Sequence, residues 1–209
     1  MKKLLIVLAV LAAVALVADF VARAYSESQA ANVMKTGLHL SEKPEVSLGG
    51  FPFLVHLAME QFDSVVIEDS SFEVAGLPIR KVHIELDQVR FSLSSLVTGG
   101  HGEIEAKDGH GTAELTEEAV TAAFRARGVP LDLRFVDGHV EVTSDLVGGT
   151  ITAVLSLDGR KLVLSSPSDA QTYSITLPRL IPGIRYTKAE VKENIVVISF
   201  DIRGQSFKV

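Results

Sequence analysis

The chain has no cysteine and no tryptophan among its 209 residues. The absence of cysteine excludes disulfides and a lipid-modified N-terminal cysteine, so the fold depends on its apolar core alone. The absence of tryptophan excludes a tryptophan-lined platform for sugars. The formal net charge is -6, and no cluster of Lys and Arg follows the N-terminal lysines. This charge balance disfavours a nucleic-acid partner and an electrostatic grip on an anionic membrane, so lipid contacts would be mainly apolar.

The sequence also lacks the short patterns of common catalytic sites. It has no G-x-S-x-G elbow, no S-x-x-K motif and no glycine-rich phosphate loop. The segment GGHGEIEAKDGHG combines two histidines with three carboxylates, but their spacing fits no metal site, and we interpret it as solvated turns around a short strand. These residues are His101, Glu103, Glu105, Asp108 and His110. We predict no metal, no other cofactor and no enzymatic activity; a hydrolase with a dispersed site is kept as an alternative.

A long apolar run begins near the N-terminus. Lys2 and Lys3 precede residues 4–18, which include no polar side chain, and Asp19 ends the run. A basic start followed by a short apolar stretch is typical of a secretory signal peptide or a signal anchor. Because the lysines stay on the cytoplasmic side, we expect the rest of the chain to be exported, to the extracytoplasmic face of the plasma membrane or to a periplasm-like space.

The sequence leaves cleavage of this leader open. A membrane-spanning helix needs about 20 apolar residues, more than the run provides, and Ala22-Arg23-Ala24 resembles an A-x-A cleavage site. We assign residues 1–24 to a signal peptide or signal anchor and residues 25–209 to a single domain. Helical spacing of apolar residues continues to Lys35, and Gly37 is a typical helix end. Cleavage would remove the start of this long helix, which favours retention of the leader.

The rest of the chain is patterned mainly as antiparallel strands. Residues 82–86 alternate between apolar and polar side chains, as expected for a strand with one buried face. Alternating runs also flank Asp137-Gly138 and Asp158-Gly159, and this dipeptide between such runs predicts β-hairpins. Thr116 is a typical N-cap for a second, short helix. The sequence therefore predicts an α+β fold in which the first helix covers the apolar face of a long meandering sheet.

Two apolar segments are interrupted by proline, namely residues 49–54 (GGFPFL) and residues 177–184. The aromatic rings of the first segment either plug the core from a turn or form an apolar lip that meets acyl chains or a membrane surface. In a chain rich in Leu, Val and Ile and without a catalytic pattern, such segments suggest binding of an apolar ligand. The candidate lipid-binding residues are Phe51, Pro52, Phe53, Leu54, Leu177, Leu180, Ile181 and Ile184.

Several stretches follow one another as in a known family. A helix of the form D-x-V-A-x-x-x-x-E-S starts at Asp19, and GFPFL at 50–54, QFDSVVIE at 61–68 and GLPIRKVHIELDQVRFSLSSL at 76–96 come after it. Together with the basic leader, these stretches resemble the actinobacterial LmeA-type family of exported phospholipid-binding proteins. That family is associated with elongation of mannan on lipid-anchored glycans of the envelope. The resemblance implies a tubular, BPI-like fold, in which a curved antiparallel β-sheet wraps a long N-terminal helix and leaves an apolar tunnel with the GFPF segment as its lip.

We therefore hypothesise an exported, membrane-associated and non-enzymatic protein with one lipid-binding domain, whose partner is a phospholipid or a membrane surface. It would support maturation of envelope lipids or lipoglycans. The alternative is a membrane-tethered scaffold that docks an envelope glycosyltransferase or transporter. A continuous apolar cavity would favour the first hypothesis, and a solid core would favour the second. Inward residues expected to line such a cavity include Val82, Ile84, Leu86, Leu155 and Ile198.

Overall fold

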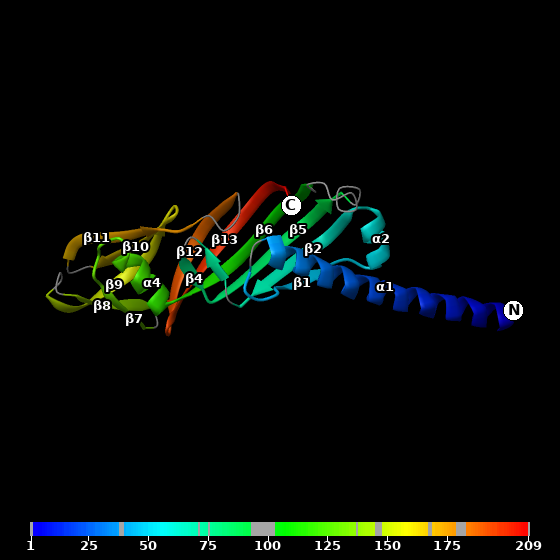
Figure 1. Ribbon diagram of the computed structural model, residues 1–209, viewed down its shortest axis with the longest axis horizontal. Helices are drawn as coiled ribbons and strands as arrows, with labels where there is room; N and C mark the ends of the chain where they lie inside the picture. The colour runs from blue at the N-terminus through cyan, green and yellow to red at the C-terminus, as the bar shows by residue number, and fades with distance from the viewer. Residues whose placement is uncertain are drawn as a thin grey trace.

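The computed structural model has an α+β fold with a long N-terminal helix and mostly antiparallel strands, as predicted. The molecule is elongated, and the first helix projects from one end (Figure 1). The structure describes residues 2–37, 40–70, 72–74, 76–92, 103–136, 138–144, 148–166, 169–178 and 183–208.

The largest sheet has six antiparallel strands in the order β1-β2-β5-β6-β13-β12. Its strands are β1 (Glu45–Leu48), β2 (Gln61–Asp69), β5 (Lys81–Phe91), β6 (Glu103–Thr116), β12 (Ile184–Lys192) and β13 (Ile195–Lys208). A second sheet has the order β11-β10-β9-β8-β7, and β12 of the first sheet packs against its strand β9. Its strands are β7 (Asp132–Val136), β8 (His139–Ser144), β9 (Gly149–Asp158), β10 (Lys161–Ser166) and β11 (Asp169–Thr176). A small hairpin pairs β3 (Phe72–Val74) with β4 (Leu77–Ile79).

The three described helices differ sharply in length and in burial. Helix α1 (Lys2–Gly37) is one continuous helix that passes through residue 24, and it packs against β1 and α2. Helix α2 (Phe53–Ala58) is short and packs on α1 and β2. Helix α4 (Glu117–Arg125) packs on β7, β4 and β6, and Thr116 is its N-cap, accepting a hydrogen bond from the Ala119 N–H at 3.2 Å, as predicted.

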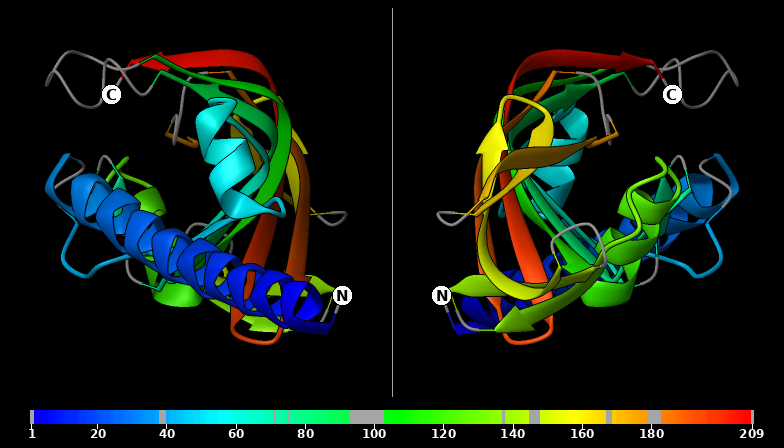
Figure 2. Two further views of the ribbon diagram at one scale, coloured as in Figure 1. Left: turned by 90° about the vertical axis from the view of Figure 1, so that its right-hand side faces the viewer. Right: turned by 90° about the vertical axis from the view of Figure 1, so that its left-hand side faces the viewer.

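The six-stranded sheet is strongly curved, as the end-on views show (Figure 2). Two glycines on the central strand β6 let large neighbours cross its concave face. A Cβ at Gly111 would collide with the His83 carbonyl and lie 2.6 Å from Cζ of Phe200, and a Cβ at Gly109 would lie 2.7 Å from Cδ2 of Leu86. Glycine inside a strand typically marks such close approach and bending. Wrapping of this sheet around α1 to form a tube remains a prediction.

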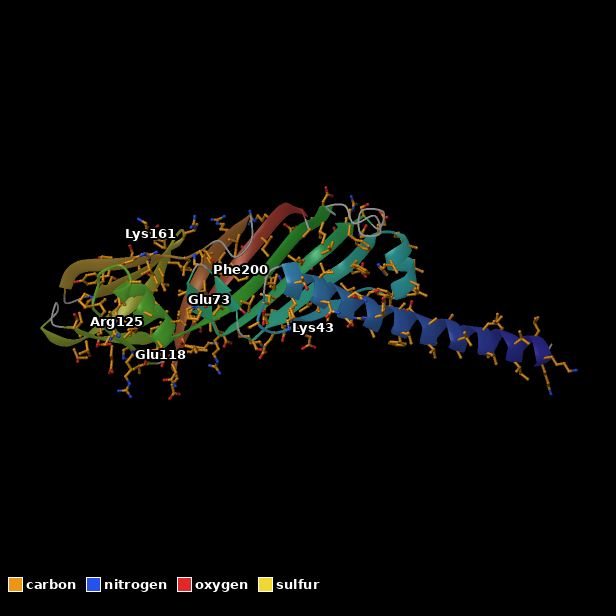
Figure 3. The ribbon with its side chains drawn as sticks, in the orientation of Figure 1. Lys43, Glu73, Glu118, Arg125, Lys161 and Phe200 are labelled. Atoms are coloured by element: carbon orange, nitrogen blue, oxygen red, sulfur yellow. The ribbon has the colours of Figure 1, made fainter. Side chains whose placement is uncertain are left out.

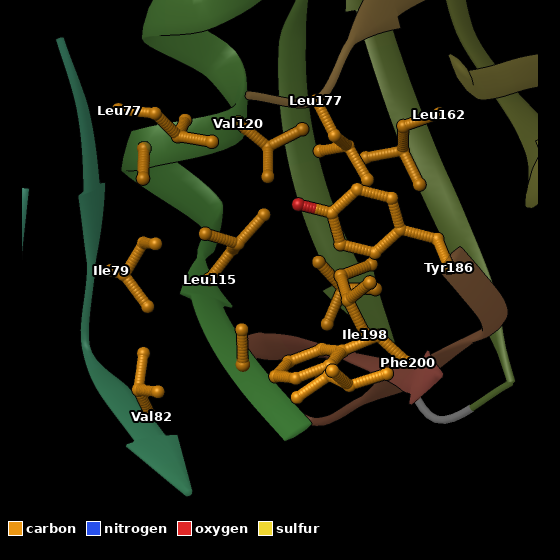
Figure 4. Packing of buried hydrophobic residues seen from close by; sticks show 14 of the residues in the cluster. Leu77, Ile79, Val82, Leu115, Val120, Leu162, Leu177, Tyr186, Ile198 and Phe200 are labelled. Carbon is orange, nitrogen blue, oxygen red and sulfur yellow. The ribbon is translucent and has the colours of Figure 1, made fainter. Parts of the chain in front are cut away.

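The concave side of this sheet belongs to one hydrophobic core that continues into the second sheet. Figure 4 shows Tyr186, Ile198 and Phe200 from β12 and β13 facing Leu115 of β6 and Ile79 of β4. The Tyr186 and Phe200 rings meet edge to face with centroids 6.2 Å apart. Small residues on β6 and large residues on its neighbours thus fill the bend together.

Strand β6 is longer than its sequence pattern predicts. The GGHGEIEAKDGHG interpretation placed turns around Asp108-Gly109, but the described part of that segment, from Glu103, is one unbroken strand. His101 lies outside the described residues. The buried positions of β5 change phase between Leu86 and Val89, with Gln88 at a φ of 49° between them. The pairing register of β5 with β2 and β6 does not change at this point. The buried positions of β2 and β6 change phase opposite the same residues, so the three strands change together.

Helix side chains protect the exposed edges of both large sheets. The edge strand β7 donates its Phe135 N–H to Oε2 of Glu117 at 2.6 Å and its Leu133 N–H to Oγ1 of Thr121 at 3.3 Å. The edge strand β1 donates its Leu48 N–H to Oε1 of Glu27 on α1 at 2.9 Å. Edge N–H groups that find such partners cannot pair with another chain. Helices α1 and α4 are therefore tied to the sheets by hydrogen bonds as well as by apolar packing.

Candidate functional site

The two phenylalanines on either side of Pro52 have opposite environments. Phe53 is fully buried, whereas Phe51 is 65% exposed. The Phe53 ring stacks on Phe62, with centroids 5.5 Å apart, and Phe62 stacks on Phe91 at 4.8 Å. Of the two alternatives for this segment, the core plug therefore describes Phe53, and an exposed apolar position describes Phe51. Pro52 is exposed as well.

The side of α2 that faces away from the sheet is apolar and exposed. We call it the outer face of α2 and define it as Phe51, Leu54, Val55 and Met59, which are 65%, 42%, 49% and 68% exposed. Val55 and Met59 are four residues apart and lie on one side of the helix, next to Leu54, and Phe51 precedes the N-cap residue Pro52. Figure 1 shows α2 at the end of the sheet from which the N-terminal half of α1 projects. Helix α2 thus lies beside α1 at this end of the sheet.

Asp19, the residue that ends the apolar run, holds the start of α2. The N-cap residue of α2 is Pro52, whose side chain makes no capping hydrogen bond. The Phe53 N–H donates to Oδ2 of Asp19 at 2.9 Å, and the Leu54 N–H donates to Oδ1 at 2.8 Å. Asp19 is 6% exposed. One carboxylate from α1 therefore satisfies two first-turn N–H groups that α2 cannot satisfy from its own cap.

Further polar contacts tie the second half of α1 to the domain. Glu27 lies two turns after Asp19 and accepts from the Leu48 N–H, and Arg23 between them donates to Glu27 at 2.9 Å. Lys43, labelled in Figure 3, donates to Oγ of Ser28 at 2.9 Å. Asp19, Arg23 and Glu27 recur every four residues, so they lie along one side of the helix. This side also carries Ala31, which is 2% exposed.

The first half of α1 makes no comparable contact with the part of the chain that the structure describes. Helix residues Lys2–Thr36 contain an 18-residue window with a mean hydropathy of 2.9, of which 6% is buried. Its large apolar side chains from Leu4 to Val17 are 46–73% exposed. The helix is long and apolar enough to cross a membrane, and a signal sequence has the same features. A buried core helix, in contrast, would have its apolar side chains covered.

The second proline-interrupted segment is only partly described. Leu177 is 3% exposed and Ile184 is half-buried on β12, whereas Leu180 and Ile181 lie outside the described residues. The Tyr186 hydroxyl donates to the Pro178 carbonyl at 2.6 Å, and Arg160 donates to the Leu177 carbonyl at 3.1 Å. Both contacts hold the start of the segment against the sheets.

A small apolar pocket lies where this segment meets the concave sheet. It has a volume of about 10 Å³, which is close to that of a single water site. Figure 4 looks into this region, and Tyr186 reaches across it toward Leu177. The lining residues are Leu77, Ile79, Ala113, Leu115, Leu177, Pro178, Tyr186 and Ile198. As described, this pocket is far too small for an acyl chain.

The residues expected to line a cavity do not all share one wall. Val82, Leu86 and Ile198 are buried on the concave face of the six-stranded sheet, and Ile84 on the same face is half-buried. Leu155 is buried too, but it lies on β9 of the second sheet. The predicted set therefore forms part of one extended core rather than the wall of one defined cavity.

A larger and more polar pocket opens at the α2 end of the six-stranded sheet. Its volume is about 360 Å³. It involves the start of β2, the end of β5, the start of β6 and Gly204 of β13, and its lining residues are Gln61, Gln88, Arg90, Glu105, Ala106, Lys107 and Gly204. The mixture of two cations with one carboxylate and two amides marks it as a polar surface depression.

Several of the described titratable groups lie in ion pairs on the sheet surface. Within the described ranges, no group of three His, Asp or Glu side chains is arranged to hold a metal ion. His110 Nε2 lies 3.5 Å from Glu85, and His83 Nδ1 lies 2.8 Å from Glu68. The hydrogen bond from His83, followed by the positive charge of Lys81, lowers the pKa of the Glu68 carboxyl below its ordinary value of 4.5. These pairs lie on a half-exposed sheet surface.

Pattern analysis missed Asp19, Val55 and Met59. In the sequence, Asp19 was identified only as the residue that ends the apolar run. A carboxylate at the end of such a run was the one signal that could have indicated a contact between this residue and the domain. Val55 and Met59 belong to a helix too short to show periodicity. They are exposed because the Phe53 ring attaches the opposite side of α2 to the sheet, through its stacking on Phe62.

The comparison with protein families matches most of the chain. The model of the LmeA-like phospholipid-binding family matches residues 17–200, a range that begins just before Asp19 and ends in β13. No match was found among curated proteins or among solved structures. The matched range contains the docked half of α1, α2, the second sheet, the six-stranded sheet up to the first half of β13 and the segment after Leu177. The chain belongs to the LmeA-like phospholipid-binding family.

Proposed function

We propose that this protein is an exported, membrane-anchored phospholipid-binding protein that supports the maturation of cell-envelope lipids or lipoglycans. The observation that carries the proposal is the match to a phospholipid-binding family over residues 17–200. The apolar leader supports an anchor in the membrane, because its side chains are exposed along a helix long enough to cross one. The protein binds lipid without catalysing a reaction, and its binding residues are apolar side chains.

The concave face of the six-stranded sheet is the proposed binding surface for acyl chains. It is lined by apolar side chains, and Ile84 on β5 is half-buried there. Leu177 and Pro178 cover one part of this face, and the hydrogen bond from Tyr186 to Pro178 holds them in place. Binding of a chain would require this cover to move, since the pocket beneath it is about 10 Å³. Burial of apolar area, at about 25 cal/mol per Å², would then supply the affinity.

Lipid co-purification tests this function directly. The full chain is extracted in detergent, exchanged into a lipid-free buffer with detergent and examined by native mass spectrometry and lipid extraction. We expect a phospholipid to stay bound at a stoichiometric level. Ile84→Gln should reduce the bound fraction severalfold, because it places an amide on the concave face. Glu85→Gln is the matched control, since its side chain lies on the opposite face of the same strand and should leave binding unchanged.

A membrane-tethered scaffold is the second candidate, and the small size of the apolar pocket favours it. In that case the apolar surface of the protein docks an envelope glycosyltransferase or transporter instead of taking up lipid. Crosslinking in cells followed by mass spectrometry would find one stoichiometric protein partner. Absence of bound phospholipid in the native spectra, together with such a partner, would replace the first proposal by this one.

A further inference from the structure

We propose that the outer face of α2 inserts into the surface of the same bilayer that α1 crosses, and that Asp19 fixes α2 at this depth. The proposal rests on the membrane anchor of the proposed function, and it is independent of phospholipid uptake by the sheet. It assigns a membrane contact to four side chains and a positioning role to one carboxylate. The occupant of the surface is a lipid bilayer, because α2 packs on α1 and is held by Asp19 at the end of the exposed apolar run of α1.

The length of the leader sets the level of α2. The run of exposed residues from Leu4 to Val21 includes only one buried residue, Asp19. At 1.5 Å per residue it is about 27 Å long. This nearly matches a hydrocarbon core of about 30 Å. Because Asp19 lies at the end of this run and holds the first turn of α2, that turn lies at the level of the bilayer surface. Tyr25, which is 66% exposed, then lies where tyrosines are enriched at membrane interfaces.

Helix α2 has the composition of an interfacial helix. Its six residues are apolar except His56, whose Nδ1 lies 3.2 Å from the Gln61 carbonyl and whose Nε2 lies 3.7 Å from Asp63. The side with Phe53 is packed on the sheet, but the outer face is apolar as well and has no cover among the described residues. A helix that is apolar on all sides is typical of a core or of a membrane, and here only one side is in the core.

Asp19 explains how such a short helix keeps its position. Six residues do not form a stable helix alone, and the proline at the N-cap offers no acceptor. The carboxylate satisfies two N–H groups of the first turn from a rigid neighbouring helix. The same bonds make the carboxylate tolerable beside the acyl region, since its oxygens are hydrogen-bonded without water. A chain cut after Ala24 would lose Asp19, so the proposal also requires that the leader is retained.

Fluorophore labelling in vesicles tests the insertion. The chain has no cysteine, so single cysteines can carry an environment-sensitive dye in the full protein reconstituted into phosphatidylcholine vesicles. Val55→Cys reports on α2, and Val154→Cys is a matched control, because the two valines are 49% and 47% exposed and Val154 lies on β9 in the second sheet. We expect a blue-shifted emission from position 55, quenched by nitroxides near the lipid headgroups. Position 154 should emit as in water. Equal, water-like emission from both positions would overturn the proposal.

A dye at Val10→Cys and two variants of Asp19 complete the design. The dye at position 10 should be quenched by nitroxides deep in the acyl region, and water-like emission there would overturn both the anchor and this proposal. Asp19→Ala should abolish the blue shift at position 55 and leave position 10 unchanged; a persistent shift would overturn the role of Asp19. Asp19→Asn, which keeps one acceptor oxygen, should retain part of the shift. Insertion at position 55 without bound phospholipid in native spectra would reject the proposed function alone and support this one.

Discussion

Helices α1 and α2 present two sides of opposite character. The side toward the sheets combines the buried ring of Phe53 with carboxylates that accept backbone N–H groups, namely Asp19 and Glu27. The side away from the sheets is the outer face of α2, and the part of α1 from Leu4 to Val21 has exposed apolar residues all around it except at Asp19. In a protein surrounded only by water, the second side would bear the polar groups.

The difference shows that the two sides are adapted to different surroundings. On the inward side, a hydrogen bond to a backbone N–H replaces a contact with water, so each polar residue has a defined partner. On the outward side, apolar side chains have no protein partner in the described structure, and lipid is the medium that would favour them. The boundary between the two regimes along α1 lies at Asp19, five residues before the A-x-A motif ends at Ala24.

The largest expected effect compares the two phenylalanines around Pro52. Phe53→Ala removes a fully buried ring that stacks on Phe62, and it should lower the free energy of unfolding by about 3–5 kcal/mol. Phe51→Ala should change it by at most about 0.5 kcal/mol, because the ring is exposed. Urea unfolding of the full chain in detergent micelles, followed by circular dichroism, measures both. Equal losses would mean that Phe51 also belongs to the core.

The next effect separates the two halves of α1. A chain that starts at Val17 keeps Asp19 and should unfold at the same urea concentration as the complete chain. A chain that starts at Tyr25 lacks the two hydrogen bonds from Asp19 to α2, and its free energy of unfolding should be lower by about 1–3 kcal/mol. Comparison of the two truncated chains under identical conditions is the measurement. If they are equally stable, α1 before residue 25 contributes nothing to the domain.

A smaller effect is expected at the second tie between α1 and the sheet. Glu27→Ala leaves the half-buried Leu48 N–H of the edge strand without its partner, which should cost about 0.5–1.5 kcal/mol. Arg23→Ala removes only the ion pair with Glu27 and should cost about 0.5 kcal/mol or less. Hydrogen exchange of the Leu48 amide should accelerate in the first variant only. The reverse order of losses would show that the ion pair, and not the backbone contact, holds the helix.

Local patterns predicted the elements of this fold but not all of their partners. The hairpin of β9 and β10 around Gly159 and the cap at Thr116 depend on neighbouring residues, so they were predictable. Asp108-Gly109 was wrongly expected to lie in a turn, because dipeptide chemistry does not show that β6 needs glycine where Leu86 and Phe200 cross it. In this case the packing of neighbouring strands overrode the local signal.

The candidate site was predictable in composition and not in geometry. The GFPFL segment was recognisable as unusual, but the sequence left both of its rings with the same two alternatives. Only the stacking of Phe53 on Phe62, across two elements, separates them. Likewise, the contact from Asp19 to α2 spans 34 residues, and no local period encodes it. Side-chain type therefore indicated apolar binding, while the tertiary contacts decide which side chains are free to contact lipid.

The smallest effect is expected for a charge pair away from α1. It tests whether such a pair stabilises the fold as much as the contact of Glu27 with the Leu48 N–H does. Glu68 pairs with His83 and Lys81 on a half-exposed sheet surface, and these partners lower the pKa of its carboxyl in the folded protein. A carboxyl whose folded pKa is lowered stabilises the protein above the unfolded pKa of about 4.5, and this stabilisation is lost as the pH falls through the folded pKa. Glu68→Gln should therefore show a shallower loss of stability below about pH 4.5, and a slightly lower stability at neutral pH.

The loss of stability in Glu68→Gln at neutral pH should be smaller than the loss in Glu27→Ala. Solvent screens an exposed charge pair, whereas the Leu48 N–H needs its acceptor. Urea midpoints measured at a series of pH values from about 3 to about 7 would show this. An effect larger than that of Glu27→Ala would contradict the distinction between backbone and side-chain partners.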